Sequence, residues 1–156
     1  MLTPHVENFE RGLDELKPVL PSHYEELSLH RNKGFELDPM FDRYIAKERL
    51  GEVLYITIRD KGELAGYFIG LIGPGLHYRS CFTLQTDIFY VRKEYRGNGG
   101  GMVLFRFVEA EAKRRGAHLW ISGDKEHAKM HADKLHLAIG FEKIENVYGL
   151  WLKEHD

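Results

Sequence analysis

Apolar residues recur along the middle of the chain in the rhythm of strands. Residues 52–60 and 63–72 (EVLYITIRD and ELAGYFIGLI) are rich in β-branched and aromatic side chains, which favours extended structure. The turn Asp60-Lys61-Gly62 between them predicts a β-hairpin, which Gly73-Pro74-Gly75 ends. A third run, residues 82–91 (FTLQTDIFYV), predicts one more strand of the same sheet.

Other segments carry apolar residues at helical spacing. From Arg11 to Leu29 leucines and aromatics recur in this way, and Pro18 and Pro21 predict a break in that helix. Asp38-Pro39 predicts an N-cap for a helix from Met40 to Leu50, which Gly51 closes. Residues 102–115 predict an amphipathic helix with a basic last turn.

The two ends of the chain complete an α/β pattern. TPHVENF at residues 3–9 predicts a short first strand, and AHLWIS at 117–122 predicts a strand after the long helix. Asp124 is a candidate N-cap for a helix through Ile139, and FEKI and VYGLWLK predict a closing pair of strands. We expect a single domain over residues 1–156 of mixed α/β class, with a crossover helix.

Composition narrows the classes of function. A chain of 156 residues is long enough for one core, and a formal charge of -2 gives no general attraction to nucleic acid or to an anionic membrane. Cys81 is the single cysteine, which excludes an internal disulfide and favours a reducing compartment. No apolar run approaches the roughly 20 residues of a membrane span. We therefore expect a cytoplasmic protein.

A glycine-rich stretch stands between the third strand and the long helix. Its sequence is Arg96-Gly97-Asn98-Gly99-Gly100-Gly101, and such a loop aims free backbone N–H groups and the helix dipole at one point, which suits an anion. The Walker pattern and the dinucleotide pattern GxGxxG both fail, because each requires a particular residue where Met102 stands. The alternative is a turn that merely closes a βα unit.

The stretch YRGNGGG after a strand ending in valine resembles the pyrophosphate loop of the GNAT superfamily of acyl-CoA-dependent N-acyltransferases. The resemblance covers most of the chain, down to Gly140-Phe141 after the last predicted helix. PVLPSHYEEL, LDPMFDRY and LHYRS are also similar to acetyltransferase-like proteins of phages and bacteria. This resemblance implies a mostly antiparallel central sheet with a strand, Gly-loop and helix site for coenzyme A (CoA), flanked by helices.

The resemblance also implies how acetyl-CoA binds as a co-substrate. The loop amides would take the pyrophosphate, and Arg96 would orient the loop or meet a phosphate. The backbone of the third strand would pair with the pantetheine arm as another strand does, so this strand should part from AHLWIS there. The residues expected to bind the cofactor are Phe89, Tyr90, Val91, Arg96, Gly97, Asn98, Gly99, Gly100 and Gly101.

Acyl transfer to an amine needs a base, a donor to the oxyanion and an acid for the leaving thiolate. A backbone N–H near Val91 is the expected oxyanion donor. Strand alternation predicts one shared face for Thr83, Gln85, Asp87, Phe89 and Val91. Relatives often place a Glu on this strand, where Gln85 stands here and cannot titrate. Asp87 is therefore the candidate base, and its alternative role is to hold a backbone amide or an Arg.

For the acid, the family often has a tyrosine four residues before the Gly-Phe pair, and His136 occupies that position. Imidazole can protonate a thiolate, although a histidine on a half-exposed helix face is the alternative. Tyr148 in the predicted closing strands is the fallback donor, unless it is a core tyrosine. His127 and His131 are four residues apart but have no third ligand in the sequence, so no metal is expected.

These residues favour an N-acetyltransferase whose partner is a small-molecule or protein amine, without nucleic acid or membrane. The segment His77-Tyr78-Arg79 suits either acceptor entry or a homodimer contact. The alternative function is a non-catalytic acyl-CoA-binding sensor or interaction module, which Gln85 and the missing helix tyrosine allow.

Overall fold

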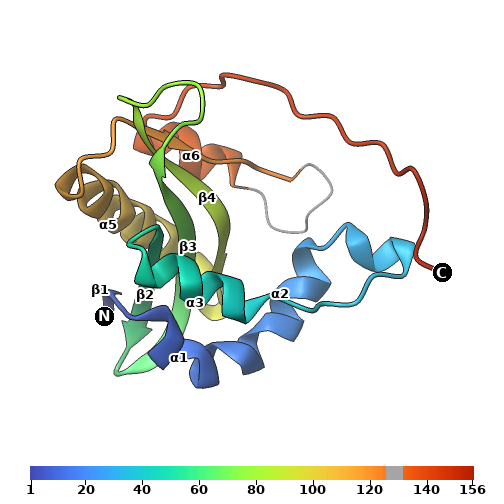
Figure 1. The fold of residues 1–156 in the computed structure, drawn as a ribbon. Coiled ribbons are helices and arrows are strands. Elements are labelled where there is room, and N and C mark those ends of the chain that lie inside the picture. Colours follow the sequence, from blue (N-terminus) through green and yellow to red (C-terminus); the bar gives the residue numbers. More distant parts are fainter. Residues whose placement is uncertain (126–131) are drawn as a thin grey trace.

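The fold is built on one five-stranded sheet, seen in a computed structural model that describes residues 1–125 and 132–156 (Figure 1). The strand order is β1-β2-β3-β4-β5; the first three pairings are antiparallel and β4 pairs with β5 in parallel. The strands are β1 Leu2–Val6, β2 Val53–Asp60, β3 Glu63–Pro74, β4 Phe82–Val91 and β5 Leu119–Ile121. The expected mixed, mostly antiparallel sheet is confirmed.

Helices surround this sheet. They are α1 Phe9–Leu16, α2 Leu20–Leu27, α3 Phe41–Arg49, α4 Lys93–Arg96, α5 Gly100–Arg114 and α6 Asp133–Ile139, with 3-10 turns η1 Lys17–Val19 and η2 His30–Lys33. Pro18 and Pro21 fall in the first turns of η1 and α2, so the expected break is confirmed. Within the described residues, no helix is both long and apolar enough to cross a membrane.

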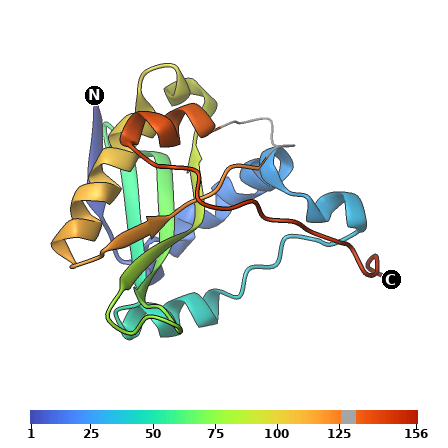
Figure 2. The same cartoon turned by 90° about the horizontal axis from the view of Figure 1, so that it is seen from above.

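The sheet buries a different cluster on each face. Leu54, Ile56 and Phe68 pack with Leu104 and Phe105 of α5 on one face. On the other face the core is formed with α1 and α3, by Phe9, Leu13, Leu16, Val53, Tyr55, Tyr67 and Tyr90. Figure 2 shows the sheet between these two layers of helices. Alternating strand residues therefore supply two cores.

Turn chemistry explains the hairpin and the end of α3. Lys61 (φ 51°) and Gly62 (φ 86°) both have positive φ, the requirement of a two-residue hairpin turn whose twist matches the strands. Gly51 (φ 75°) follows α3 as expected. The expected cap at Asp38 is wrong: Met40 is the N-cap, because a local bond from Phe41 N–H to Pro39 O delays the helix.

The last helix begins later than expected. It starts at Asp133 with Ala132 as its N-cap, while Asp124 Oδ1 accepts the Ala132 N–H at 3.0 Å. The strand AHLWIS is confirmed only over the three residues of β5. His127 and His131 lie outside the described residues.

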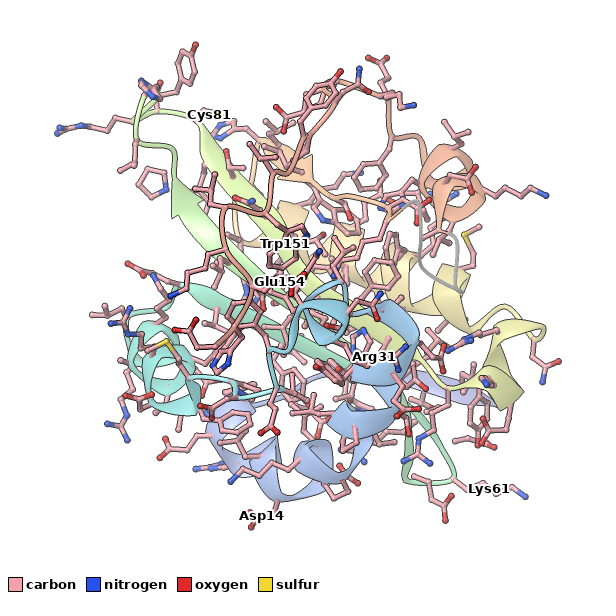
Figure 3. All side chains as sticks on the ribbon, turned by 90° about the vertical axis from the view of Figure 1, so that its right-hand side faces the viewer. Asp14, Arg31, Lys61, Cys81, Trp151 and Glu154 are labelled. Carbon is pink, nitrogen blue, oxygen red and sulfur yellow. The ribbon has the colours of Figure 1, made fainter. Side chains whose placement is uncertain are left out.

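The closing pair of strands is wrong. Residues 140–156 have no regular secondary structure and run as one extended segment past the sheet to η2 (Figure 1). Trp151 stacks on Phe35 with ring centroids 5.9 Å apart, and Lys33 pairs with Glu154 at 3.2 Å. Figure 3 places Trp151 and Glu154 on the side where Arg31 of η2 lies. This end of the segment therefore packs beside η2, and no residue of 140–156 pairs with a strand of the sheet.

Candidate functional site

The two parallel strands part shortly after they meet. β4 pairs with β5 only at Thr83, Leu84 and Gln85, while it continues to Val91 against β3. Residues 86–91 of β4 therefore have one edge without a strand partner, which we call the open edge. An unpaired edge is a template for another extended chain. This is the parting that the family resemblance implies.

The open edge presents particular backbone groups. Arg92 N–H donates to Ala65 O of β3 at 2.9 Å. Because successive residues of a strand alternate, the N–H and C=O groups of Val91 and Phe89 point the opposite way, to the open edge. Val91 O accepts a 2.8 Å bond from Arg96 Nε. The Phe89 groups and the Val91 N–H are thus placed to meet an extended amide-bearing ligand.

Two glycines of the loop are required by the fold itself. Gly99 is the residue before α5 and has a φ of 78°, which side chains rarely adopt. Gly100 is buried, and a Cβ there would lie 2.7 Å from Tyr95 O and 3.0 Å from Val91 Cγ1. The positive φ of Gly99 and the lack of space at Gly100 both require glycine in the turn from α4 into α5.

Gly97 differs from these two. Its φ of -72° is ordinary, and a Cβ would meet no atom within 4 Å. A Cβ on Gly101 would be 3.0 Å from Leu135 Cδ2, a tight contact with α6. Neither strain nor internal packing explains Gly97, whereas open space for a ligand does.

The first turn of α5 supplies donors for an anion. The N–H groups of Gly100, Gly101 and Met102 have no carbonyl of an earlier helical turn to bond, and they stand at the positive end of a helix of 15 residues. Gly97, Asn98 and Gly99 in front of them are exposed. The loop therefore fits a pyrophosphate by donor supply, dipole and free space.

Arg96 holds this loop against the sheet. Its Nε bonds to Val91 O, its Nη2 pairs with Glu26 of α2 at 2.6 Å, and its guanidinium lies 5.4 Å from the centre of the Tyr90 ring. The Tyr90 hydroxyl also donates to Glu26 at 3.1 Å. Burial, and then the bond to Glu26, raises the pKa of Tyr90. Of the two roles expected for Arg96, the geometry matches orientation of the loop.

A β-bulge changes which face each residue of β4 occupies. Ile88 pairs with Ile69 and Thr86 pairs with Gly70, so Asp87 is the extra residue. The expected shared face is wrong for Phe89 and Val91, because this extra residue reverses the alternation after it. Phe89 and Val91 pack with the α5 core, whereas Asp87 points to α3.

Asp87 is bound by one side chain in the described part of the chain. The Tyr44 hydroxyl of α3 donates to its Oδ2 at 2.6 Å. Burial, and then the contact with Asp87, raises the pKa of Tyr44, so the phenol stays protonated as a donor. Asp87 and Gln85 are both exposed. A carboxylate that is open to solvent and oriented by a phenol can accept a proton.

His136 is buried, at 8% exposure, which excludes the half-exposed helix face that was its alternative. Nδ1 lies 2.6 Å from Ala132 O and Nε2 lies 2.7 Å from Ser122 Oγ. The ring also packs edge-on against Phe105 and Phe141. Each ring nitrogen of His136 therefore has a polar partner, while the rest of the ring packs on aromatic side chains.

Two hydroxyl residues at this site escaped the sequence reasoning. Thr86 Oγ1 donates to Ser122 Oγ at 2.9 Å, and Trp120 Nε1 donates to Thr86 Oγ1 at 2.9 Å. Ser122 directly follows β5 and is half-buried. The sequence offered one signal for Ser122, because this serine ends a predicted strand beside the candidate site.

Tyr148 is not brought to this site. Its exposure is 88%, and no hydrogen bond or ring contact joins it to another described residue. The loop with His77, Tyr78 and Arg79 is exposed between β3 and β4. Among the described residues no group of three His, Cys, Asp or Glu side chains is arranged to hold a metal.

A buried histidine on the α2 face was also missed. His23 is 2% exposed, stacks on Tyr90 with centroids 4.7 Å apart, and has Nδ1 2.5 Å from the Tyr67 hydroxyl. Burial, then the charges of Lys125 and Arg96, lowers its pKa to about 3. Because the ring stays neutral at physiological pH, it supports the β4 face without adding charge.

Comparisons with known proteins agree with this geometry. The model of the acetyltransferase (GNAT) family matches residues 19–141. No curated protein matches the chain by sequence.

Several solved structures of similar fold are acetyltransferases. Ribosomal-protein-alanine N-acetyltransferase from Brucella melitensis biovar Abortus 2308 has a TM-score of 0.71 at 18% identity, over 97% of this chain and 99% of that one. A predicted acetyltransferase with acetyl-CoA from Clostridium acetobutylicum has a TM-score of 0.67 at 13% identity, over 97% of each chain. Glucosamine-6-phosphate N-acetyltransferase from Arabidopsis thaliana has a TM-score of 0.69 at 13% identity, over 98% and 99%.

Proposed function

The chain belongs to the acetyltransferase (GNAT) family, and we propose that it moves an acetyl group from acetyl-CoA to a primary amine on a small molecule or a protein. Family membership makes it an acetyltransferase with acetyl-CoA as the donor.

The loop and the open edge would hold the donor. The amides of Gly97 to Gly101 are assigned to the pyrophosphate, and the backbone of Phe89 to Val91 is assigned to the pantetheine amides. Arg96 keeps the loop in place through Val91 O and Glu26. Bound acetyl-CoA supplies the acetyl group as a thioester, and the open-edge N–H of Phe89 or Val91 is assigned to the carbonyl oxygen.

Proton transfer is divided between the two faces of β4. Asp87, on the face of α3, is assigned as the base that accepts the proton of the amine, directly or through water. His136, on the face of α6, is assigned as the source of the proton for the departing sulfur. Tyr148, which is 88% exposed and has no hydrogen bond to another described residue, has no support as the donor. A base and an acid on opposite sides of one strand suit an amine and a thiol that approach from opposite sides.

The acceptor is assigned to a chemical class, that of amines. Asp87 gives the α3 face a carboxylate at the bulge, which favours an amine that arrives as a cation. The solved acetyltransferases of similar fold are named for a protein alanine and for an amino sugar phosphate. The chain would form a homodimer through the exposed loop that carries Leu76 and Tyr78. It would be located in the cytoplasm, where its one free thiol stays reduced.

The parting of β4 from β5 beside the glycine loop is the observation that carries this function. The test supplies acetyl-CoA with a panel of amines that includes polyamines, amino sugars and peptides with free N-termini. Thiol release and the mass of the acetylated product are measured, with Asp87→Asn as the inactive comparison. A protein that binds acetyl-CoA but acetylates no amine in the panel would instead be a binding module.

A further inference from the structure

Five groups at the point where β4 and β5 part form one hydrogen-bonded chain. It runs from Trp120 Nε1 to Thr86 Oγ1, on to Ser122 Oγ, across the His136 ring, and ends at Ala132 O. The indole N–H can only donate and the backbone carbonyl can only accept. While the His136 ring is neutral, the two ends therefore fix the direction of the bonds between them.

This direction determines the hydrogens on His136. Nδ1 must carry a hydrogen, because Ala132 O accepts only. In the neutral ring Nε2 is then an acceptor and takes the Ser122 hydrogen. In the charged ring Nε2–H donates to Ser122 Oγ instead, and the Ser122 hydrogen is released to point elsewhere. Both states fit the same positions of the heavy atoms.

Thr86 and Trp120 prepare Ser122 for this exchange. Trp120 occupies a lone pair of Thr86, so the Thr86 hydrogen is directed at Ser122 Oγ. Ser122 can accept from Thr86 and from charged His136 at once and still donate its own hydrogen. Of the two proton-exchanging partners, Ser122 is half-buried and His136 is 8% exposed. A proton from His136 therefore leaves through Ser122.

We propose that Ser122 is the residue that hands the proton to the departing sulfur of coenzyme A, and that His136 acts through it. Ser122 Oγ gives its hydrogen to the sulfur and takes the hydrogen of His136 Nε2 as the S–H bond forms. His136 returns to the neutral ring with Nδ1–H on Ala132 O. The amine loses one proton to Asp87, and the sulfur gains one from His136 through Ser122. Asp87 then releases its proton to solvent and His136 takes one up, which restores both groups. The inference rests on the proposed function.

The direct readout is the ionisation of the bound coenzyme A thiol, which is followed by the ultraviolet absorbance of the thiolate as the pH is raised. A bound thiolate carries a negative charge and is a stronger acceptor than the neutral Nε2 of His136, so the Ser122 hydrogen turns to the sulfur and stabilises the thiolate. Ser122→Ala should therefore bind coenzyme A as tightly as wild type but lower the ionisation constant of its thiol about tenfold, the value of one hydrogen bond to a charged group. Ser22→Ala, an exposed serine of α2, is the matched control and should change neither quantity.

Turnover supplies the second readout. Ser122→Ala should lower kcat about 10²-fold, the usual contribution of a positioned acid, with KM for acetyl-CoA unchanged. Ser122→Thr keeps the hydroxyl and should restore most of kcat. Ser122→Val has the shape of threonine but no hydroxyl, so it should behave as Ser122→Ala does and replaces it if alanine destabilises the fold.

The outcomes separate this inference from the proposed function. An unchanged thiol ionisation in Ser122→Ala with normal binding of coenzyme A overturns the relay and leaves acetyl transfer intact. An acetyl ester on Ser122, seen in the intact mass after exposure to acetyl-CoA, also overturns it, because Ser122 would then be a nucleophile. A wild-type protein that does not bind coenzyme A overturns both.

Discussion

Thr86 and Ser122 are joined through their side chains, 2.9 Å apart, at the first position where the backbones of β4 and β5 no longer pair. The bond closes the apex of the gap between the strands. It also connects the gap to His136, which bonds to Ser122 from α6. The opening between β4 and β5 is therefore connected to the hydrogen-bonded chain through Ser122 and His136.

Thr86→Val tests this apex. The substitution keeps the shape of the side chain but leaves Trp120 Nε1 without an acceptor, so the free energy of unfolding should fall by about 1–3 kcal/mol. Thr83→Val, on the paired part of β4, is the control and should cost less. The measurement is urea denaturation, and equal losses for the two variants would contradict the account.

Gly97 and Gly100 should respond oppositely to a side chain. Gly97→Val enters open space, so stability should stay within about 0.5 kcal/mol of wild type. Coenzyme A binding should weaken about 10-fold or more, as bonds to a charged phosphate are lost. Gly100→Val should lower the melting temperature, since its Cβ would lie 2.7 Å from Tyr95 O. The idea fails if Gly97→Val binds coenzyme A normally.

Asp87 and Tyr44 can be separated by kinetics. Asp87→Asn should lower kcat about 10²-fold or more if the carboxylate accepts the proton of the amine, with little change in stability because Asp87 is exposed. Tyr44→Phe removes only the orienting hydroxyl and should have a much smaller effect on kcat. Full activity of Asp87→Asn would show that Asp87 is structural.

His23 should make the protein sensitive to acid. Its pKa of about 3 in the fold lies below the ordinary value of 6.5, so between these pH values the unfolded chain binds a proton that the folded chain does not. The free energy of unfolding should therefore fall by about 1.4 kcal/mol per pH unit as the pH drops below 6.5.

The variant His23→Gln should lose that part of the slope, whereas His5→Gln, at an exposed histidine of β1, should keep it. Denaturation curves from pH 4 to pH 7 provide the comparison. Identical slopes in His23→Gln and wild type would mean that His23 is already charged in the fold.

Local patterns in the sequence were sufficient for most of the sheet. The run from Phe82 to Val91 became β4 with the expected bounds, and the turn at Lys61 closed the expected hairpin. The bulge at Asp87 could not be foreseen, because it depends on the register against Gly70 of β3. Alternation along one strand therefore assigned Phe89 to the wrong face.

Packing between residues far apart in the sequence determined the parts of the structure that local patterns did not predict. VYGLWLK has the composition of a strand, but Trp151 packs on Phe35 and the segment stays unpaired. The family resemblance made His136 a candidate through its position before Gly140-Phe141, whereas Ser122 and Thr86 gain meaning only when β5 lies beside β4. Contacts between residues distant in sequence carry no local signal.

Isothermal titration calorimetry of coenzyme A and acetyl-CoA shows whether the glycine loop and the open edge of β4 hold this cofactor. We expect one saturable site per chain for both ligands and a heat that is strongly reduced in Gly97→Val. Absence of binding by either ligand at millimolar concentration, with a folded protein, would contradict this expectation.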